Sequence, residues 1–238
     1  MDDLDCQGPV VDQTLRELEF INRWLGGNAV TLQGVQQLIR DHSGKISIAD
    51  LGCGGGDMLK LIAEFGRRKG IPMQLTGIDA NPHIIAFARS NCAAYPEIQF
   101  ETVDIFSAEF ASRSFDLVTG TLFYHHFTSE QLVVFFSQLS RQVRIGFVFN
   151  DIHRHWLAYH SIRLLTRLFS KSGMVQFDAP LSVLRAFRKS ELQSIFHQAG
   201  VVVELRWKWA FRWQGLYRVG SYLWHSFRSF RGNSTHLS

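Results

Sequence analysis

The residues best suited to bind a ligand form a glycine cluster, Gly52-Cys53-Gly54-Gly55-Gly56, which follows an apolar run and leads directly into an amphipathic segment. This order predicts a strand, a tight turn and a helix, with a nucleotide-like molecule lying over bare backbone at the N-terminus of the helix. Gly52 and Gly54 lack a Cβ atom, so the chain can bend sharply there and approach a ligand closely. A glycine turn alone is weak evidence, because many strand–helix units need one for packing.

Three carboxylates accompany this turn at regular places in the chain. Asp50 lies in the apolar run before the glycines, Asp79 follows a predicted strand 27 positions after Gly52, and Asp104 follows the next predicted strand. Each falls at or near the carboxyl end of its strand, the edge where open α/β sheets bind ligands. Asp79 could accept hydrogen bonds from both hydroxyls of a ribose. Singly, each acid could be an ordinary strand-end residue; together with the glycine turn they indicate a ligand site.

Candidate groups for proton transfer lie in the segments that follow the fourth and fifth predicted strands. They are His125, His126 and His153, with Asp151 as a carboxylate that could orient an imidazole. Histidine suits the removal of a proton from an acceptor because the pKa of imidazole lies near working pH. The alternative is that these histidines pack against a ligand or a helix and transfer no proton.

The same segments could instead form a metal site. His126, Asp151, His153 and His155 could gather around a divalent ion. Magnesium prefers oxygen ligands, however, and this set is mostly imidazole. We therefore expect no metal.

Alternating strands and helices must position these groups. Two amphipathic helices, over 11–25 and 29–40, precede the first strand, whose apolar run begins at Ile48. The second to fifth strands are predicted over 73–78, 98–103, 115–120 and 144–149, and a final antiparallel pair over 201–213. Helices are predicted over 58–65, from Pro82 after an Asn81 cap, and over 128–141, 155–170 and 190–200. No repeat or low-complexity linker interrupts this order, so residues 1–238 are expected to form one domain. Its expected parts are N-terminal helices over 1–44, a ligand-binding core over 45–205 and a basic aromatic tail over 206–238. The core includes a helical insert at about 152–184.

With an acid, any residue and then Gly-x-Gly-x-Gly, the stretch 50–56 resembles the first motif of the class I S-adenosylmethionine-dependent methyltransferases, and the likeness extends over about 46–205. The resemblance implies an α/β, Rossmann-like, doubly wound sheet of seven mostly parallel strands with an N-terminal helical lid. It implies S-adenosylmethionine as cofactor, with Gly52 and Gly54 facing its methionine part and Asp79 holding the ribose. The other cofactor-binding residues that it implies are Asp50, Cys53, Ala80, Asp104, Ile105 and Thr121.

The rival ligand for such a turn is a nicotinamide dinucleotide. Its fingerprint, Gly-x-Gly-x-x-Gly, seats a pyrophosphate at the helix N-terminus. Counted from Gly52, the last position of that fingerprint is Asp57, whose carboxylate would repel phosphate but suits a cationic sulfonium. The methyltransferase interpretation is therefore preferred.

The acceptor is expected to be a small lipophilic or aromatic molecule, methylated at oxygen more readily than at carbon. The segment after the fourth strand lacks the Asp/Asn-Pro-Pro-aromatic tetrad of amino-directed nucleic-acid methyltransferases, and the insert over 152–184 is rich in apolar and aromatic residues. These residues could equally be core. A cofactor-binding protein without catalysis remains an alternative.

Charge is distributed unevenly along the chain. Residues 152–238 carry a net charge of +10, and residues 1–151 carry −6. Basic and aromatic residues alternate in the tail, a pattern that suits an anionic membrane surface or nucleic acid, or simply a solvated face. Peripheral membrane association is thus an open expectation, and an RNA methyltransferase is the less favoured alternative. The absence of a long apolar run and of a basic leader predicts a cytoplasmic protein, and Cys6, Cys53 and Cys92 are expected to be reduced thiols.

Overall fold

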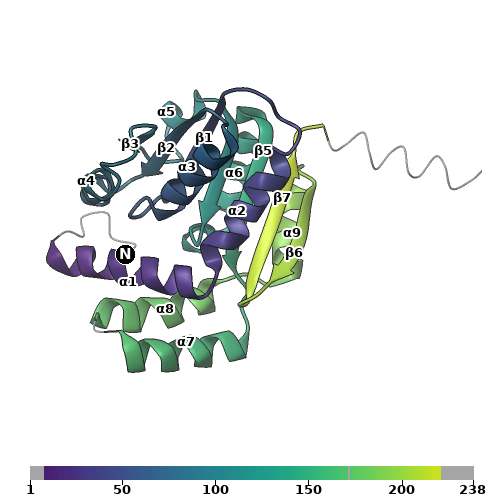
Figure 1. The fold of residues 1–238 in the computed structure, drawn as a ribbon. Coiled ribbons are helices and arrows are strands. Elements are labelled where there is room, and N and C mark those ends of the chain that lie inside the picture. Colours follow the sequence, from purple (N-terminus) through teal and green to yellow (C-terminus); the bar gives the residue numbers. More distant parts are fainter. Residues whose placement is uncertain (1–7, 171, 221–238) are drawn as a thin grey trace, which may run out of the picture.

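The protein is seen in a computed structural model, which describes residues 8–170 and 172–220. Its centre is a seven-stranded sheet of order β3-β2-β1-β4-β5-β7-β6 (Figure 1). The strands are β1 (Ile46–Leu51), β2 (Met73–Asp79), β3 (Ile98–Thr102), β4 (Phe115–Thr121), β5 (Val143–Ile152), β6 (Val203–Lys208) and β7 (Arg212–Arg218). β1 to β5 pair in parallel, whereas β7 runs antiparallel to both β5 and β6. The predicted Rossmann-like fold with seven mostly parallel strands is confirmed.

Helices cover both faces of this sheet and one of its ends. The helices of the described residues are α1 (Pro9–Trp24), α2 (Gly27–Leu38), α3 (Asp57–Lys69), α4 (Pro82–Asn91), α5 (Ala108–Ala111), α6 (Ser129–Gln142), α7 (Trp156–Phe169), α8 (Gly173–Arg185) and α9 (Lys189–Gln198), with a 3-10 turn η1 (Tyr124–His126). One apolar core joins α2, α3 and α4 to the sheet, and a second, rich in phenylalanine, joins α5, α6 and α9 to the opposite face. This three-layer arrangement buries the strands on both sides, as parallel sheets require.

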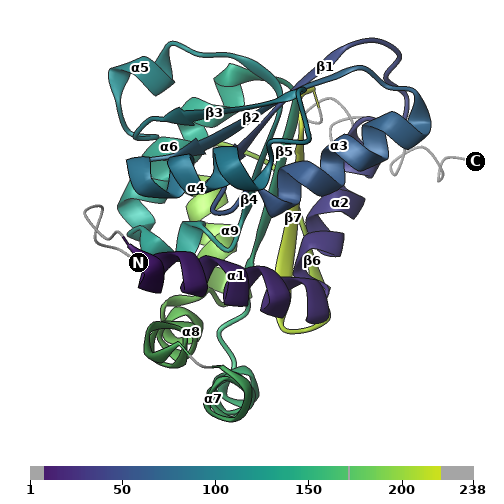
Figure 2. The same ribbon diagram turned by 60° about the vertical axis from the view of Figure 1, so that its left-hand side comes forward.

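Helices α1, α7 and α8 stand apart from these layers. Figure 2 shows α1 running across the end of the sheet, with α7 and α8 beneath it. α8 packs against α1, α7 and η1. The side chains of Thr14 in α1 and Ser172 at the start of α8 share a hydrogen bond of 3.0 Å. Of the two N-terminal helices, α1 thus lies where a lid would lie, whereas α2 packs on the sheet; the action of a lid remains a prediction.

The local signals read from the sequence coincide with the observed element boundaries. The Asn81 side chain accepts hydrogen bonds from the backbone amides of His83 and Ile84, and Pro82 is the first residue of α4. Thr128 and Gln131 form the predicted capping box at the start of α6. These caps satisfy amides that a helix start leaves without intrahelical partners.

The final strand pair extends beyond its predicted limits. The prediction confined both strands to residues 201–213, whereas β7 ends at Arg218. The predicted boundary between core and tail at 205 therefore falls inside β6, and the first part of the basic aromatic tail belongs to the sheet. Trp213 and Tyr217 are core residues. The remaining aromatic and basic residues of that tail, Tyr222, Trp224, Phe227, Arg228, Phe230 and Arg231, lie outside the described residues, as does Cys6.

Candidate functional site

A cavity of about 490 Å³ opens at the carboxyl ends of β1, β4 and β5. The glycine turn and Thr121 form one side, α1 another, and α7, α8 and the β6–β7 turn close the rest. Of the residues predicted to bind a cofactor, the cavity is lined by Asp50, Gly52, Cys53, Gly54 and Thr121, whereas Asp79 lies outside the lining. The fold therefore brings the first motif and the end of β4 to one hollow, which is the expected ligand edge of an open α/β sheet.

The glycine turn adopts a conformation that depends on its glycines. Gly52, Gly54 and Gly56 have φ values of 60°, 51° and 80°, in the left-handed region that other residues rarely adopt. A Cβ atom on Gly52 would sit 2.2 Å from the ring of Phe123. The turn can therefore follow this path only without side chains, and it leaves its backbone exposed to the cavity at the start of α3.

Asp50 lies in β1 directly beneath this turn. Its carboxylate is buried and accepts a hydrogen bond of 2.7 Å from the hydroxyl of Thr119. Burial, with a smaller contribution from the charge of Asp57, raises the pKa of Asp50 to about 7, although the Thr119 hydrogen bond works in the opposite direction. A cation bound in the cavity would favour the ionised form of this carboxylate.

Asp79 lies beside the turn at the end of β2. Leu51 of β1 is paired with Ile78 of β2, so Asp79 and Gly52 occupy neighbouring positions on adjacent strands. Burial raises the pKa of Asp79, opposed by hydrogen bonds from the backbone amides of Asn81, Gly54 and Ala80. The carboxylate is therefore held in place next to the glycine turn, as a residue that binds a ribose would need to be.

The other residues predicted to contact adenosine lie farther along the same edge. The amide of Val103 donates to the carbonyl of Asp79 at 3.0 Å, which places the end of β3 against the end of β2. Asp104 is exposed and accepts a hydrogen bond from the amide of Phe106, while Ile105 is buried. Ala80, Asp104 and Ile105 follow the strand ends without lining the cavity itself.

The structure joins two of the candidate proton-transfer residues into a pair. His125 Nδ1 lies 2.8 Å from Asp151 Oδ1, and both side chains are buried. The second carboxylate oxygen accepts hydrogen bonds from the amides of Tyr124 and His125, at 2.8 and 3.1 Å. Burial acts to raise the pKa of Asp151, but its interaction with His125 and the backbone amides of Ile152 and His125 outweighs burial and lowers it.

This pairing determines which nitrogen of His125 can act as a base. An ionised carboxylate only accepts hydrogen bonds, so Asp151 selects the tautomer in which Nδ1 of His125 carries the proton. Nε2 then has a free lone pair, and this buried atom has no hydrogen-bond partner among the described residues. His125 also lines the cavity.

The other two histidines are placed differently. His126 is exposed, lines the cavity and stacks near His125, with ring centroids 4.3 Å apart. His153 does not line the cavity; its Nδ1 accepts a hydrogen bond from Trp207 Nε1 at 3.3 Å, and its ring packs on Trp213. The structure thus places the ring of His153 against Trp207 and Trp213 and outside the cavity lining.

Neither thiol chemistry nor a metal centre is apparent in the described part of the chain. Cys53 is buried in the glycine turn, where burial and the charges of Asp79 and Asp50 raise the pKa of its thiol, as is typical of an unreactive cysteine. No three His, Cys, Asp or Glu side chains within residues 8–170 and 172–220 gather closely enough to hold a metal ion.

Sequence reasoning missed Arg212 and the residues of α1 and α8 that line the cavity. Arg212 was counted as part of a basic tail, yet it is buried at the start of β7 and reaches the cavity wall. The signal available in the sequence was the alternation in Arg212-Trp213-Gln214-Gly215-Leu216, which is typical of a strand. Nothing local in the sequence indicated that α1 and α8 would meet over the sheet edge.

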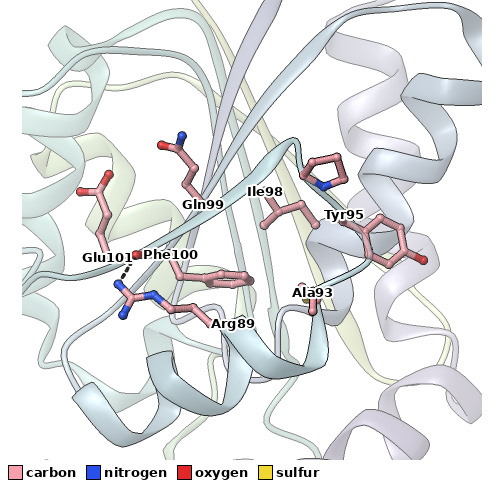
Figure 3. A pocket seen from close by; sticks show the side chains of 9 residues that line it. Arg89, Ala93, Tyr95, Ile98, Gln99, Phe100 and Glu101 are labelled. Atoms are coloured by element: carbon pink, nitrogen blue, oxygen red, sulfur yellow. Dashed lines mark hydrogen bonds between the residues drawn. The ribbon is translucent and has the colours of Figure 1, made fainter.

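A second hollow, of about 470 Å³, shares no lining residue with this cavity. It is formed by the end of α4, the loop after it and β3, and Figure 3 shows Arg89, Tyr95 and Phe100 around it. Arg89 donates a hydrogen bond of 2.7 Å to the carbonyl of Phe100. The guanidinium of Arg89 is thus bound to the backbone of β3, and none of the predicted site residues lines this hollow.

Comparison with known proteins agrees with this geometry. Residues 48–146 match the family model described as a methyltransferase domain. A search of curated proteins found no match. No helix of the described residues is long and apolar enough to cross a membrane.

Several solved structures share the fold at low sequence identity. A SAM-dependent methyltransferase from Aquifex aeolicus has a TM-score of 0.60 and 11% identity, over 87% of this chain and 98% of that one. Magnesium protoporphyrin IX methyltransferase from Synechocystis PCC 6803, with bound SAM, has a TM-score of 0.52 and 14% identity, over 81% of this chain and 80% of that one. The CMeT domain of the citrinin polyketide synthase has a TM-score of 0.57 and 16% identity over 76% of this chain, which spans about half (49%) of that chain.

Proposed function

We propose that the chain is a class I, S-adenosylmethionine-dependent methyltransferase that transfers a methyl group to an oxygen atom of a small apolar acceptor. The match of residues 48–146 to the methyltransferase domain model supports this assignment. The observation that carries the proposal is the His125–Asp151 pair, whose His125 lines the same cavity as the glycine turn. A base in the cavity is what a hydroxyl or phenol acceptor needs. The apolar character of the other walls supports the acceptor class.

The residues at the strand ends fit the cofactor. The bare backbone of Gly54 leaves room for the methionine part, since a Cβ there would have no neighbour closer than 3.9 Å. Asp79 offers a fixed carboxylate for the ribose hydroxyls, and Asp50 offers a carboxyl group beneath the turn whose ionised form a bound cation would favour. Asp104 and Ile105 would meet the adenine. The bound cofactor supplies an electrophilic methyl group on a sulfonium.

The remaining chemistry falls to residues of the chain. Asp151 holds His125 with Nδ1 protonated, so that Nε2 accepts the acceptor's proton as the oxygen attacks. Asp151 then stabilises the imidazolium that forms. Leu122 and Thr121 border the cavity between this pair and the glycine turn, a place where they can align the acceptor with the methyl group.

The cavity walls support an apolar acceptor. On the side away from the glycine turn they consist mostly of aliphatic and aromatic side chains, including Leu122, Ile152, Ala158, Ile162, Leu165, Leu181, Val183, Trp209 and Phe211. Burying apolar area of the acceptor against them contributes about 25 cal/mol per Å². A neutral sugar or a highly charged nucleotide would gain little there.

Transfer of radiolabelled methyl from S-adenosylmethionine tests the proposed reaction. The wild type is expected to label phenols and lipophilic alcohols at oxygen, and Asp151→Asn is expected to label them far more slowly. Labelling confined to nitrogen or carbon, or labelling of RNA in preference to small molecules, would contradict the proposal. Cofactor binding without transfer to any of these acceptor classes would instead support the non-catalytic alternative.

We also propose that the protein associates with anionic membranes through its basic aromatic tail, residues 206–238, and through the exposed face of α7 and α8. That face exposes Trp156, Leu164, Leu168, Phe169, Phe177 and Leu184. Helix α7 contains no acid and carries Arg163 and Arg167 among its apolar residues. Apolar side chains that enter the lipid interface beside cations that meet phosphates are typical of interfacial helices.

Binding to lipid vesicles tests this surface. Leu168→Glu is expected to reduce sedimentation with vesicles containing phosphatidylglycerol, because it places a negative charge on the apolar face. Val134→Glu is the matched control, since Val134 and Leu168 are each 65% exposed but Val134 lies on α6. Equal loss in both variants, or no binding by the wild type, would contradict a membrane role for α7 and α8.

A further inference from the structure

Arg212 is a buried cation in the cavity wall that its neighbours satisfy only in part. The side chain is 4% exposed, and it lines the cavity. Nη2 donates a long hydrogen bond of 3.4 Å to Asn22 Oδ1, while Nε and Nη1 have no hydrogen-bond partner in the described part of the chain. Arg212 forms no ion pair with a described carboxylate.

Such an arrangement is costly for the folded protein. Burying a charge without a partner is strongly unfavourable, and buried guanidinium groups are normally paired with a carboxylate. Burial lowers the pKa of Arg212 to about 10, with only the charge of Asp151 working in the opposite direction. The group nevertheless stays charged at neutral pH. Two buried donors of a residue that lines the cavity are therefore left without a partner among the described residues.

The topology explains how Arg212 reaches the reaction edge. β7 is antiparallel to its neighbours, so its first residue lies where β5 ends, and Arg212 pairs with Ile152. Gly27, at the start of α2, makes room for the side chain, because a Cβ there would sit 2.6 Å from Arg212 Nη2. α2 is in turn anchored by Asn150, whose side-chain amide donates to the carbonyl of Gly27 at 2.8 Å.

We propose that Arg212 recognises a carboxylate on the methyl acceptor, so that the acceptor is an apolar molecule with an acidic group. This inference rests on the proposed methyltransferase function and narrows its substrate class. A planar guanidinium with free donors matches a carboxylate in geometry and charge. The aliphatic and aromatic walls would receive the rest of the acceptor, while the acidic group anchors it.

The position of Arg212 favours binding of a carboxylate on the acceptor over binding of the carboxylate of the cofactor. Arg212 is three strands away from β1 in the order β1-β4-β5-β7, and this separation amounts to about 14 Å at the usual strand spacing. Its neighbours on the cavity wall are Ile152 and Phe211 rather than the glycine turn. The cofactor's methionine part is expected over that turn.

Fragment binding to the S-adenosylhomocysteine-loaded protein tests the proposal without an identified acceptor. Titration followed by NMR should show benzoate binding about 10-fold or more tightly than benzamide, the advantage expected of one charge-assisted contact. Arg212→Gln should remove this preference. Arg218→Gln is the matched control, since Arg218 lies on the same strand and donates to the carbonyls of Leu38 and Gln37. An unchanged benzoate preference in Arg212→Gln, or no preference in the wild type, would overturn the proposal.

A second pair of ligands separates the two possible sources of a carboxylate. S-Adenosylhomocysteine carries the methionine-derived carboxylate, and 5′-methylthioadenosine lacks it. If Arg212→Gln weakens binding of the first ligand and not of the second, the guanidinium serves the cofactor and the proposal is wrong. We expect each ligand to bind Arg212→Gln with the same affinity as it binds the wild type. If the wild type binds neither ligand, the methyltransferase proposal itself fails.

Gly27→Ala tests the same contact without removal of the charge. The added methyl group must displace the guanidinium, so the benzoate preference should fall while S-adenosylhomocysteine still binds. Retained cofactor binding shows that the variant is folded. A full benzoate preference in this variant would contradict the role of the observed guanidinium position.

Discussion

The buried pair of His125 and Asp151 illustrates how one carboxylate can prepare a base. Asp151 accepts hydrogen bonds from His125 Nδ1 and from backbone amides, so its charge is compensated although it is fully buried. Asp151→Asn removes that charge and can hold the imidazole in the wrong tautomer. We expect kcat to fall by about 10²–10⁴-fold, the usual contribution of a general base, with S-adenosylhomocysteine affinity nearly unchanged.

His153→Gln is the comparison for this variant, because His153 does not line the cavity. Its kcat should stay close to that of the wild type. A loss in His153→Gln as large as that in Asp151→Asn would return the catalytic role to the histidine that the structure sets apart.

Asp50 should make stability depend on pH. Its pKa is raised from 3.8 to about 7 in the folded protein, so between these values the folded state holds a proton that the unfolded state releases. Stability therefore falls as pH rises through this window, by up to about 4 kcal/mol in total. In urea denaturation, the free energy of unfolding of Asp50→Asn should increase relative to that of the wild type between pH 5 and pH 8. A constant difference between the two proteins across that range would rule out a raised pKa for Asp50.

At the scale of elements, the glycine turn sets the path from β1 into α3. Gly52→Ala places a methyl group 2.2 Å from the Phe123 ring in a left-handed conformation. Gly70, which caps α3, also has a positive φ, but a Cβ there meets nothing within 4 Å. Gly70→Ala should lose about 1–2 kcal/mol of stability and keep cofactor binding. Gly52→Ala should lose more stability in thermal unfolding and lose cofactor binding by calorimetry; equal behaviour of the two variants would contradict the account of the turn.

Local signals predicted the elements better than their extent. Caps, prolines and apolar periodicity located the strands from β1 to β5 and the helices α3, α4, α6, α7 and α9, because these signals act over one or two turns of chain; they did not locate α5 or α8. The last hairpin was placed too early, since Arg212 and Arg218 look like surface residues until tertiary packing brings them to their acceptors, Asn22 of α1 and Leu38 of α2. The pairing of His125 with Asp151, 26 residues apart, likewise depends on the register of β4 and β5.

For the whole molecule, the cavity exists only because distant segments meet over the sheet edge. The motif that predicts the cofactor lies within ten residues, but the roof combines α1 with α7 and α8, which tertiary packing alone brings together. Glu17 of α1 accepts hydrogen bonds from Ser170 and from the amide of Ser172. These few polar contacts join α1 to the α7–α8 pair, and we propose that they let the roof act as a lid.

Hydrogen exchange tests the lid. Because ligand contacts on the cavity face would hold α1 and α8 in place, S-adenosylhomocysteine should slow exchange in both helices. Exchange in α6, on the opposite face of the sheet, should change little. Protection of α6 without protection of α1 would mean that the roof does not respond to the ligand.

The central claim is that the carboxyl edge of this sheet binds S-adenosylmethionine, and calorimetric titration tests it most directly. The wild type should bind S-adenosylmethionine and S-adenosylhomocysteine but not NADH. Asp79→Ala should weaken both adenosyl ligands, while Asp41→Ala, at an exposed position outside the cavity, should bind them like the wild type. Binding of NADH alone, or no binding of any of the three, would contradict the account.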